Sequence, residues 1–201
     1  NYVQNQLSSI ATLISSQINC QLDWEETFSL SNATVKIIHQ IETLRKQKSF
    51  AIQPPTKNLD YLPYYFQFLG SPASKFFFEK FLEHLQKLKN PSTNSHRLIW
   101  LHLKPFYPNQ LTALLNEYHF DVVYDEFASV FWEPLEPEKP FESLAKKIIS
   151  SQNLTVPEKR ILRILNWCEQ FKANGVIQFN QWGCRQSQGM NFLLKNTLQQ
   201  K

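Results

Sequence analysis

Three apolar runs of strand length constrain the fold of this chain more than any other feature. They are RLIWLHL, FDVVYDEF and VIQFN, in which we expect strands at residues 97–103, 120–125 and 176–180. A continuous apolar run is typical of a strand that is covered on both faces. Helical patterns separate the runs and follow the last one. This strand–helix order predicts a parallel sheet with right-handed crossovers, and therefore an α/β domain.

The helices of this second half can be placed from their patterns and caps. We expect helices at 111–118, at 140–149 and, in the tail, at 185–199. The helix before the third strand carries a capping-box pattern at its start, Thr155 with Glu158. It should end near Asn174-Gly175, because glycine favours the left-handed conformation of a helix C-cap.

The first 90 residues have a helical pattern instead. Residues 1–48 predict two helices around INCQLDWEE, where Asp23 and Glu26 form a capping-box pattern. Ser71-Pro72 then predicts the start of a further helix, after an irregular connector at 51–69. Its apolar positions recur at helical spacing, at Phe77, Phe81, Leu85 and Leu88. We therefore expect a helical lobe at 1–90 that packs beside or partly over an α/β domain at 91–201.

Composition excludes several classes of protein. The chain has 201 residues, 42% of them hydrophobic, which is enough for a sizeable core. Its net charge of +4 is spread along the sequence, which argues against a nucleic-acid-binding face. It lacks an apolar stretch of roughly 18 residues, so no membrane span is expected. Three widely spaced cysteines argue against a disulfide framework and indicate a reducing compartment, the cytoplasm.

The ends of the sequence predict a piece of a longer protein. The chain begins with Asn1 in a helical pattern, without a leader sequence. Three strands make a small sheet, and the sequence stops one helix after the third. We therefore expect the α/β domain to be incomplete at its C-terminal end.

Cys184 is the residue that most suggests chemistry. It follows the third strand and precedes a helical pattern, at the edge where parallel sheets bind their ligands. A helix N-terminus and the neighbouring Arg185 would both favour the thiolate, the form that ligates metals or attacks electrophiles. Gly183 would allow a tight turn and a close approach to the backbone. A half-buried structural cysteine at a turn is an equally good interpretation of the same residues.

Other polar residues also fall at the predicted strand ends. His102 and Lys104 lie at the end of the first strand, and Asp125 and Glu126 lie near the end of the second, so all four could face the same crevice as Cys184. Solvated charges at the strand ends are the simpler interpretation. Cys168 lies on an apolar helical stripe and is expected in the core, and Cys20 lies in a loop. The sequence assigns no catalytic residue.

Two segments resemble the D-component subunits of 2-hydroxyacyl-CoA dehydratases and the related benzoyl-CoA reductases. They are HRLIWLHLKPFYPNQLTALLNEYHFDVVYDEFASVFWEPLEPEKPFESLAKK and NGVIQFNQWGCRQSQG, at residues 96–147 and 174–189. The Gly-Cys-Arg-Gln-Ser end is the most specific part. The first 90 residues also resemble the helical middle region of that family, so the resemblance covers nearly the whole chain. It implies a three-layer fold of the Rossmann or flavodoxin type with an added helical lobe.

The resemblance also implies an activity and a cofactor. Family members bind a [4Fe-4S] cluster through three cysteines per subunit and act on acyl-CoA thioesters through a ketyl radical. They work with a homologous second subunit and an ATP-dependent iron–sulfur activator, in anaerobic metabolism. Cys184 matches the last of the three cluster cysteines. The other two belong to an N-terminal domain absent from this sequence, so no cluster is expected on this chain alone, and activity of the isolated chain is not expected.

The positions at the strand ends and beside Cys184 indicate which residues could face the substrate, namely His102, Lys104, Glu126, Trp182 and Arg185. Two other functions remain open. A non-catalytic scaffold or acyl-CoA-binding relative could have kept the fold and lost the cluster. A thiol-dependent enzyme could use Cys184 as a nucleophile, although no histidine lies near it in the sequence.

Overall fold

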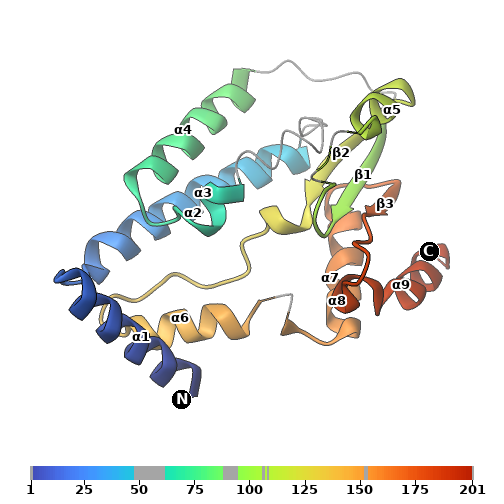
Figure 1. Cartoon of the computed structure of the whole chain (residues 1–201). Coiled ribbons are helices and arrows are strands. Elements are labelled where there is room, and N and C mark those ends of the chain that lie inside the picture. Colours follow the sequence, from blue (N-terminus) through green and yellow to red (C-terminus); the bar gives the residue numbers. More distant parts are fainter. Residues whose placement is uncertain are drawn as a thin grey trace.

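A small parallel β-sheet lies at one side of the molecule, and long helices extend away from it (Figure 1). The computed structural model describes residues 2–47, 62–87, 95–105, 107, 109–151 and 154–200. Within that part the sheet has three strands in the order β2-β1-β3, with both pairings parallel. The strands are β1 (His96–Leu101), β2 (Phe120–Asp125) and β3 (Gly175–Gln178). The predicted α/β class and parallel sheet are confirmed, with each strand within two residues of its expected bounds.

Both faces of the sheet are covered by helices, which explains why the strand sequences are continuously apolar. Alternate residues of β1 belong to two separate cores. Ile99 and Leu101 pack in a core with residues of α7 (Pro157–Gln170) and α9 (Asn191–Gln199). Leu98 and Trp100 pack with Leu115 of α5 (Leu111–Glu117). The finer expectation of a Rossmann- or flavodoxin-like fold goes beyond what three short strands establish, and it stays a prediction.

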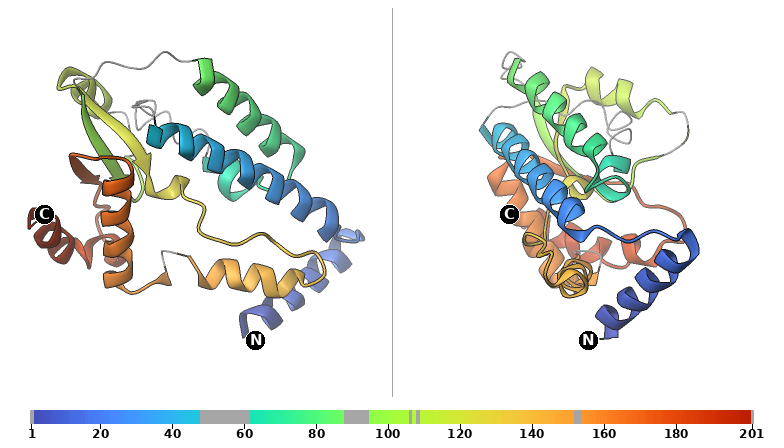
Figure 2. Two further views of the ribbon diagram at one scale, coloured as in Figure 1. Left: turned by 180° about the vertical axis from the view of Figure 1, so that it is seen from behind. Right: turned by 90° about the vertical axis from the view of Figure 1, so that its left-hand side faces the viewer.

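The helical first part has a core of its own. Two of its long helices, α2 (Trp24–Gln47) and α4 (Pro72–Lys87), lie side by side, as both views of Figure 2 show. The short helix α3 (Leu62–Phe66) packs against α4. The buried members of this core are Ile38, Ile41, Tyr65, Phe78 and Leu85. The predicted helices of this part are therefore present. The connector expected to be irregular at 51–69 is helical in part, because α3 lies within it, and its residues 51–61 lie outside the described part of the chain.

Two of the predicted helix caps are formed. The Glu26 N–H donates to Asp23 Oδ1 at 2.8 Å, and the Ser74 N–H donates to Ser71 Oγ at 3.2 Å. The apolar stripe of α4 is rotated from the expected one, because Phe78 is fully buried whereas Phe77 is only partly so. Leu88, the last residue of the expected stripe, lies outside the described residues.

Contacts cross the boundary that we expected near residue 90. Helix α1 (Tyr2–Ile18) packs against α6 (Pro140–Ile149), which lies far away in the sequence (Figure 1). The side chain of Asn32 both accepts from the Leu135 N–H and donates to the Leu135 carbonyl, each at 2.9 Å. The Pro-rich segment before α6 is therefore fastened to α2. The division into a lobe at 1–90 and a domain at 91–201 stays a prediction.

The expected caps of α7 are wrong. The N-cap is Val156, which has no side chain that could accept a hydrogen bond, so Thr155 and Glu158 form no capping box there. The helix ends at Gln170, and the left-handed residue after it is Lys172, with φ +50°. Gly175 begins β3 instead, where an added Cβ would lie 3.2 Å from Leu98 Cδ2. This glycine therefore permits close strand packing.

The tail after β3 is two helices, where we expected one. The four-residue helix α8 (Arg185–Gln188) ends at Gly189, and α9 follows after Met190. No helix among the described residues is long and apolar enough to cross a membrane.

Candidate functional site

The carboxyl ends of the three strands lie at one edge of the sheet because all three are parallel. His102 follows β1, Glu126 follows β2, and the loop to α8 follows β3. Helix α8 lies beyond the end of β3 in Figure 1. Ligands of open parallel sheets bind at this edge, so it is the candidate site.

Cys184 lies where the sequence predicts it, between β3 and a helix. It is the N-cap residue of α8, is half-buried, and donates its N–H to the Gln181 carbonyl at 3.1 Å. Gly183 before it has φ +84°, in the left-handed region that glycine adopts without strain. The backbone here thus makes the tight turn that was expected.

The electrostatic argument for a Cys184 thiolate is weaker than expected. Helix α8 has only four residues, so few peptide dipoles add up at its N-terminus. Arg185 is exposed to solvent, which screens its charge. Trp182 is fully exposed, at 101%. The loop therefore presents an indole and a guanidinium on the surface beside a half-buried thiol.

The interpretation of the strand-end charges as solvated is wrong. His102, Lys104, Asp125 and Glu126 are all buried. Lys104 donates to Asp125 in an ion pair with both side chains almost fully enclosed. Burial nevertheless lowers the pKa of Lys104, and its attraction to Asp125 offsets this only in part. These groups fasten strand ends to each other, which argues against direct contact of Lys104 with a substrate.

Sequence reasoning missed the partner of Glu126, which is Arg160 in the first turn of α7. Its Nε donates to Glu126 Oε1 and its Nη2 donates to Glu126 Oε2, both at 2.7 Å. A third nitrogen, Nη1, contacts Met190 Sδ at 2.9 Å. Arg160 is followed by Ile161 and, one turn on, by Ile164, both buried. An arginine next to the apolar face of a helix, together with an acidic residue at a strand end, was the sequence pattern that could have predicted this buried ion pair.

Glu126 also orders the end of β1. Its Oε2 accepts a hydrogen bond from the backbone N–H of His102 at 2.9 Å. His102 has φ +64°, an uncommon conformation for a residue other than glycine. Burial lowers the pKa of the His102 imidazole, and the charge of Arg160 lowers it further, whereas Glu126 raises it. One carboxylate thus connects β1, β2 and α7.

The fold is that of an α/β protein with a parallel sheet, and the candidate site lies at the carboxyl ends of its strands. The model of the family HGD-D, described as 2-hydroxyglutaryl-CoA dehydratase, D-component, matches residues 1–201. The chain belongs to this family. The suspected resemblance is therefore confirmed. Comparison with curated proteins finds no match.

The described residues do not by themselves fit an iron–sulfur cluster. Cys168 packs against the core of the sheet, and Cys20 is exposed in the turn after α1. Neither cysteine is therefore available as a second ligand beside Cys184. No group of three His, Cys, Asp or Glu side chains in the described part could hold a metal ion. A [4Fe-4S] cluster is held by thiolates at most of its irons, whereas Cys184 is the one cysteine among the described residues at this edge.

Proposed function

We propose that this chain is part of an enzyme component that removes water from 2-hydroxyacyl-CoA thioesters by one-electron, ketyl radical chemistry. The observation that carries the proposal is the family match over residues 1–201. The fold supports it, because the parallel sheet places a cysteine at the edge where such sheets bind ligands.

Cys184 is, in this proposal, one of three thiolate ligands of a [4Fe-4S] cluster. Its position after the Gly183 turn supports this role, because Cys184 lies in a surface loop and is only half-buried. The remaining ligands come from outside the described residues.

Trp182 and Arg185 are the residues that we propose for contact with the acyl-CoA. Both flank Cys184 and both are exposed. A guanidinium can pair with phosphate groups, and an indole offers an apolar face with one N–H donor. The strand ends are held in position by buried hydrogen bonds and ion pairs of His102, Lys104 and Glu126, which we do not expect to contact the acyl-CoA directly.

The partners of this component are a homologous second dehydratase subunit and an ATP-dependent iron–sulfur activator that supplies the electron. We place the enzyme in the cytoplasm, where cysteines remain reduced.

A second candidate is a non-catalytic scaffold or acyl-CoA-binding relative without a cluster. The presence of one suitable thiol among the described residues favours it. The two candidates differ in a direct way. A dehydratase converts a 2-hydroxyacyl-CoA to the 2-enoyl-CoA, whereas a scaffold binds CoA thioesters without turnover.

The test is an anaerobic assay of the assembled enzyme with its second subunit, activator, ATP and 2-hydroxyglutaryl-CoA, extended to apolar 2-hydroxyacyl-CoA thioesters. Formation of the enoyl thioester is followed by liquid chromatography. We expect Cys184→Ser to abolish turnover, and Cys168→Ser, the matched control, to retain most of it. A full rate with Cys184→Ser would refute the role of this thiol. Thioester binding without any turnover would support the scaffold.

A further inference from the structure

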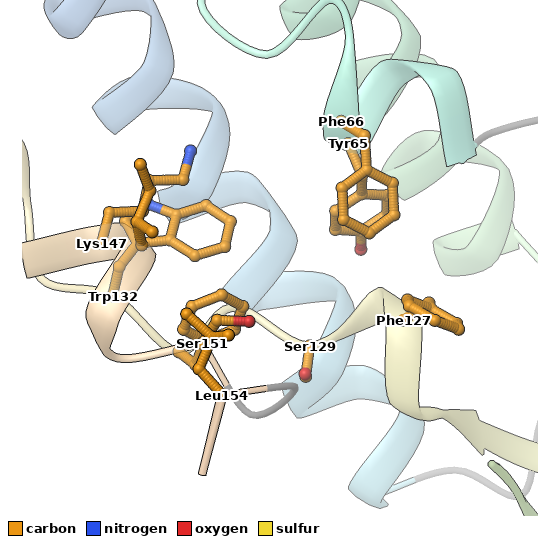
Figure 3. A pocket seen from close by; sticks show the side chains of 10 residues that line it. Tyr65, Phe66, Phe127, Ser129, Trp132, Lys147, Ser151 and Leu154 are labelled. Atoms are coloured by element: carbon orange, nitrogen blue, oxygen red, sulfur yellow. The ribbon is translucent and has the colours of Figure 1, made fainter. Parts of the chain in front are cut away.

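A cavity of about 370 Å³ lies beside the candidate edge, between α3, the C-terminal end of α6 and the 3-10 helix η2 (Glu126–Ala128) (Figure 3). Neither the strand-end ion pairs nor the Cys184 loop contributes to its lining. Its volume is in the range of ordinary small-molecule sites. Phe127, which directly follows Glu126, is one of its walls, so the cavity adjoins the end of β2.

The walls of this cavity are mainly aromatic. Tyr65 and Phe66 come from α3, Phe127 from η2, and Trp132 from the segment before α6. Phe127 is held in place on two sides, with ring centroids 6.0 Å from Phe66 and 5.7 Å from His102. Rings from three separate segments thus face one space, as Figure 3 shows. Such walls favour a ligand with a flat or apolar body.

Lys147 supplies a positive charge at the wall of this cavity. Lys147 Nζ lies 4.1 Å from the centroid of the Trp132 ring. None of the ion pairs found among the described residues includes Lys147, and the described residues that line the cavity include no acidic side chain. Burial lowers the pKa of Lys147, and no carboxylate in the described part of the chain opposes this. An anionic group brought into the cavity would therefore compensate a charge that the chain leaves partly desolvated.

Hydroxyl groups supply further polar contacts. In Figure 3 the hydroxyls of Tyr65 and Ser151 point toward the space between the rings. A carboxylate accepts hydrogen bonds from both ammonium and hydroxyl donors, and a bond to a charged group is the stronger kind. The cavity thus has aromatic walls that suit the apolar part of a ligand, and an ammonium and hydroxyl groups that suit its anionic group.

We propose that this cavity binds a small carboxylate with an apolar or aromatic body. The body packs between Phe66, Phe127 and Trp132, and the carboxylate pairs with Lys147. The proposal does not depend on the dehydratase assignment, because it concerns binding by the 201-residue chain and is measured without turnover.

The test is isothermal titration calorimetry of the whole chain with 3-phenylpropanoate and with 3-phenylpropanamide, its uncharged counterpart. We expect the carboxylate to bind at least about tenfold more tightly than the amide, because hydrogen bonds to charged groups are worth more. Lys147→Met should remove this preference and leave amide binding unchanged. Lys147→Arg, which keeps the charge, should retain it.

Two further variants locate the site. Lys146→Met is the matched control, because Lys146 is adjacent on α6 but exposed and paired with Glu142, and it should bind both compounds as the unaltered chain does. Leu154→Trp places a bulky ring at the lining and should weaken both compounds. Circular dichroism checks that each variant is folded. Equal affinity for acid and amide, no binding of either, or a preference that survives Lys147→Met would overturn the proposal.

Discussion

Arg160 and Glu126 form a two-point ion pair that is almost completely enclosed. The side chains are 5% and 1% exposed, and two parallel N–H···O bonds of 2.7 Å join them. Glu126 directly follows β2 and begins η2, whereas Arg160 is in the first turn of α7. The pair therefore fixes the angle between that helix and the sheet, at the edge that carries Cys184.

Removing one member of this pair should strongly destabilise the fold. Arg160→Met leaves the Glu126 carboxylate buried without its counter-charge, which costs about 3–5 kcal/mol. The free energy of unfolding in urea measures this loss. The double variant Glu126→Gln with Arg160→Met should be more stable than Arg160→Met alone, because no unpaired charge is then buried.

The exposed pair of Glu142 and Lys146 on α6 is the control for that experiment. Its N–O distance is 2.7 Å, as short as in the buried pair, but the side chains of Lys146 and Glu142 are 68% and 41% exposed to water. Lys146→Met should leave the unfolding curve unchanged within error, since exposed ion pairs contribute little. A loss with Lys146→Met equal to that with Arg160→Met would show that burial does not decide the energetics.

The imidazole of His102 should make the fold less stable in mild acid. Its Nδ1 is buried without a hydrogen-bond partner among the described residues, and burial lowers its pKa. The unfolded chain takes up a proton as the pH falls through 6.5, the ordinary value, while the folded chain resists protonation. The free energy of unfolding therefore falls from just above that pH down to the folded pKa.

His102→Asn tests this dependence, because asparagine does not titrate and tolerates a positive φ. We expect the variant to lose less stability than the unaltered chain between about pH 7.5 and about pH 5.5. His39 has the opposite effect, because a hydrogen bond to Glu42 raises its pKa. It is present in both proteins, so its contribution cancels. Identical pH profiles would contradict the assignment to His102.

Gly183 should be replaceable only at a conformational cost. Its φ is +84°, and no atom lies within 4 Å of an added Cβ, so strain and not collision opposes a side chain. Gly183→Ala should cost about 1 kcal/mol in urea unfolding, and Gly183→Asn less, because asparagine visits this region more readily. If alanine proved as stable as glycine, the left-handed turn before Cys184 would be in doubt.

The cysteines should differ in their reaction with iodoacetamide at neutral pH. Burial raises the pKa of the Cys168 thiol, so little of it is thiolate, whereas Cys20 is exposed. We expect alkylation of Cys168 to be slower than that of Cys20 in the folded chain. Peptide mass spectrometry at timed intervals measures both rates, and their difference should disappear in denaturant. Faster labelling of Cys168 would contradict its place in the core.

The strands and most helices could be predicted because local patterns determine them. The apolar run around Ile99 predicted a strand with two covered faces, and the structure buries its alternate residues in two different cores. Helix ends were harder. Lys172 adopts the left-handed conformation that the sequence favours at Gly175, because Gly175 is needed where Leu98 packs closely. Tertiary packing overrode the local preference.

The candidate site was predictable in position but not in its interactions. The Gly183 turn and the place of Cys184 follow from the residues around them. The burial of Lys104 and Glu126 does not, because a charge beside a strand looks solvated until its partner is known. Asp125 is 21 residues from Lys104, and Arg160 is 34 residues from Glu126. Only the folded arrangement brings such pairs together.

The central claim is that Cys184 supplies one ligand of an iron–sulfur cluster in the assembled enzyme. Its most direct test is the iron and sulfide content of the anaerobically reconstituted holoenzyme, together with the broad visible absorption of the cluster. The account predicts that Cys184→Ser lowers both, while Cys168→Ser, whose thiol packs against the core, leaves them unchanged. A Cys184→Ser enzyme with unaltered iron, sulfide and absorption would contradict the claim.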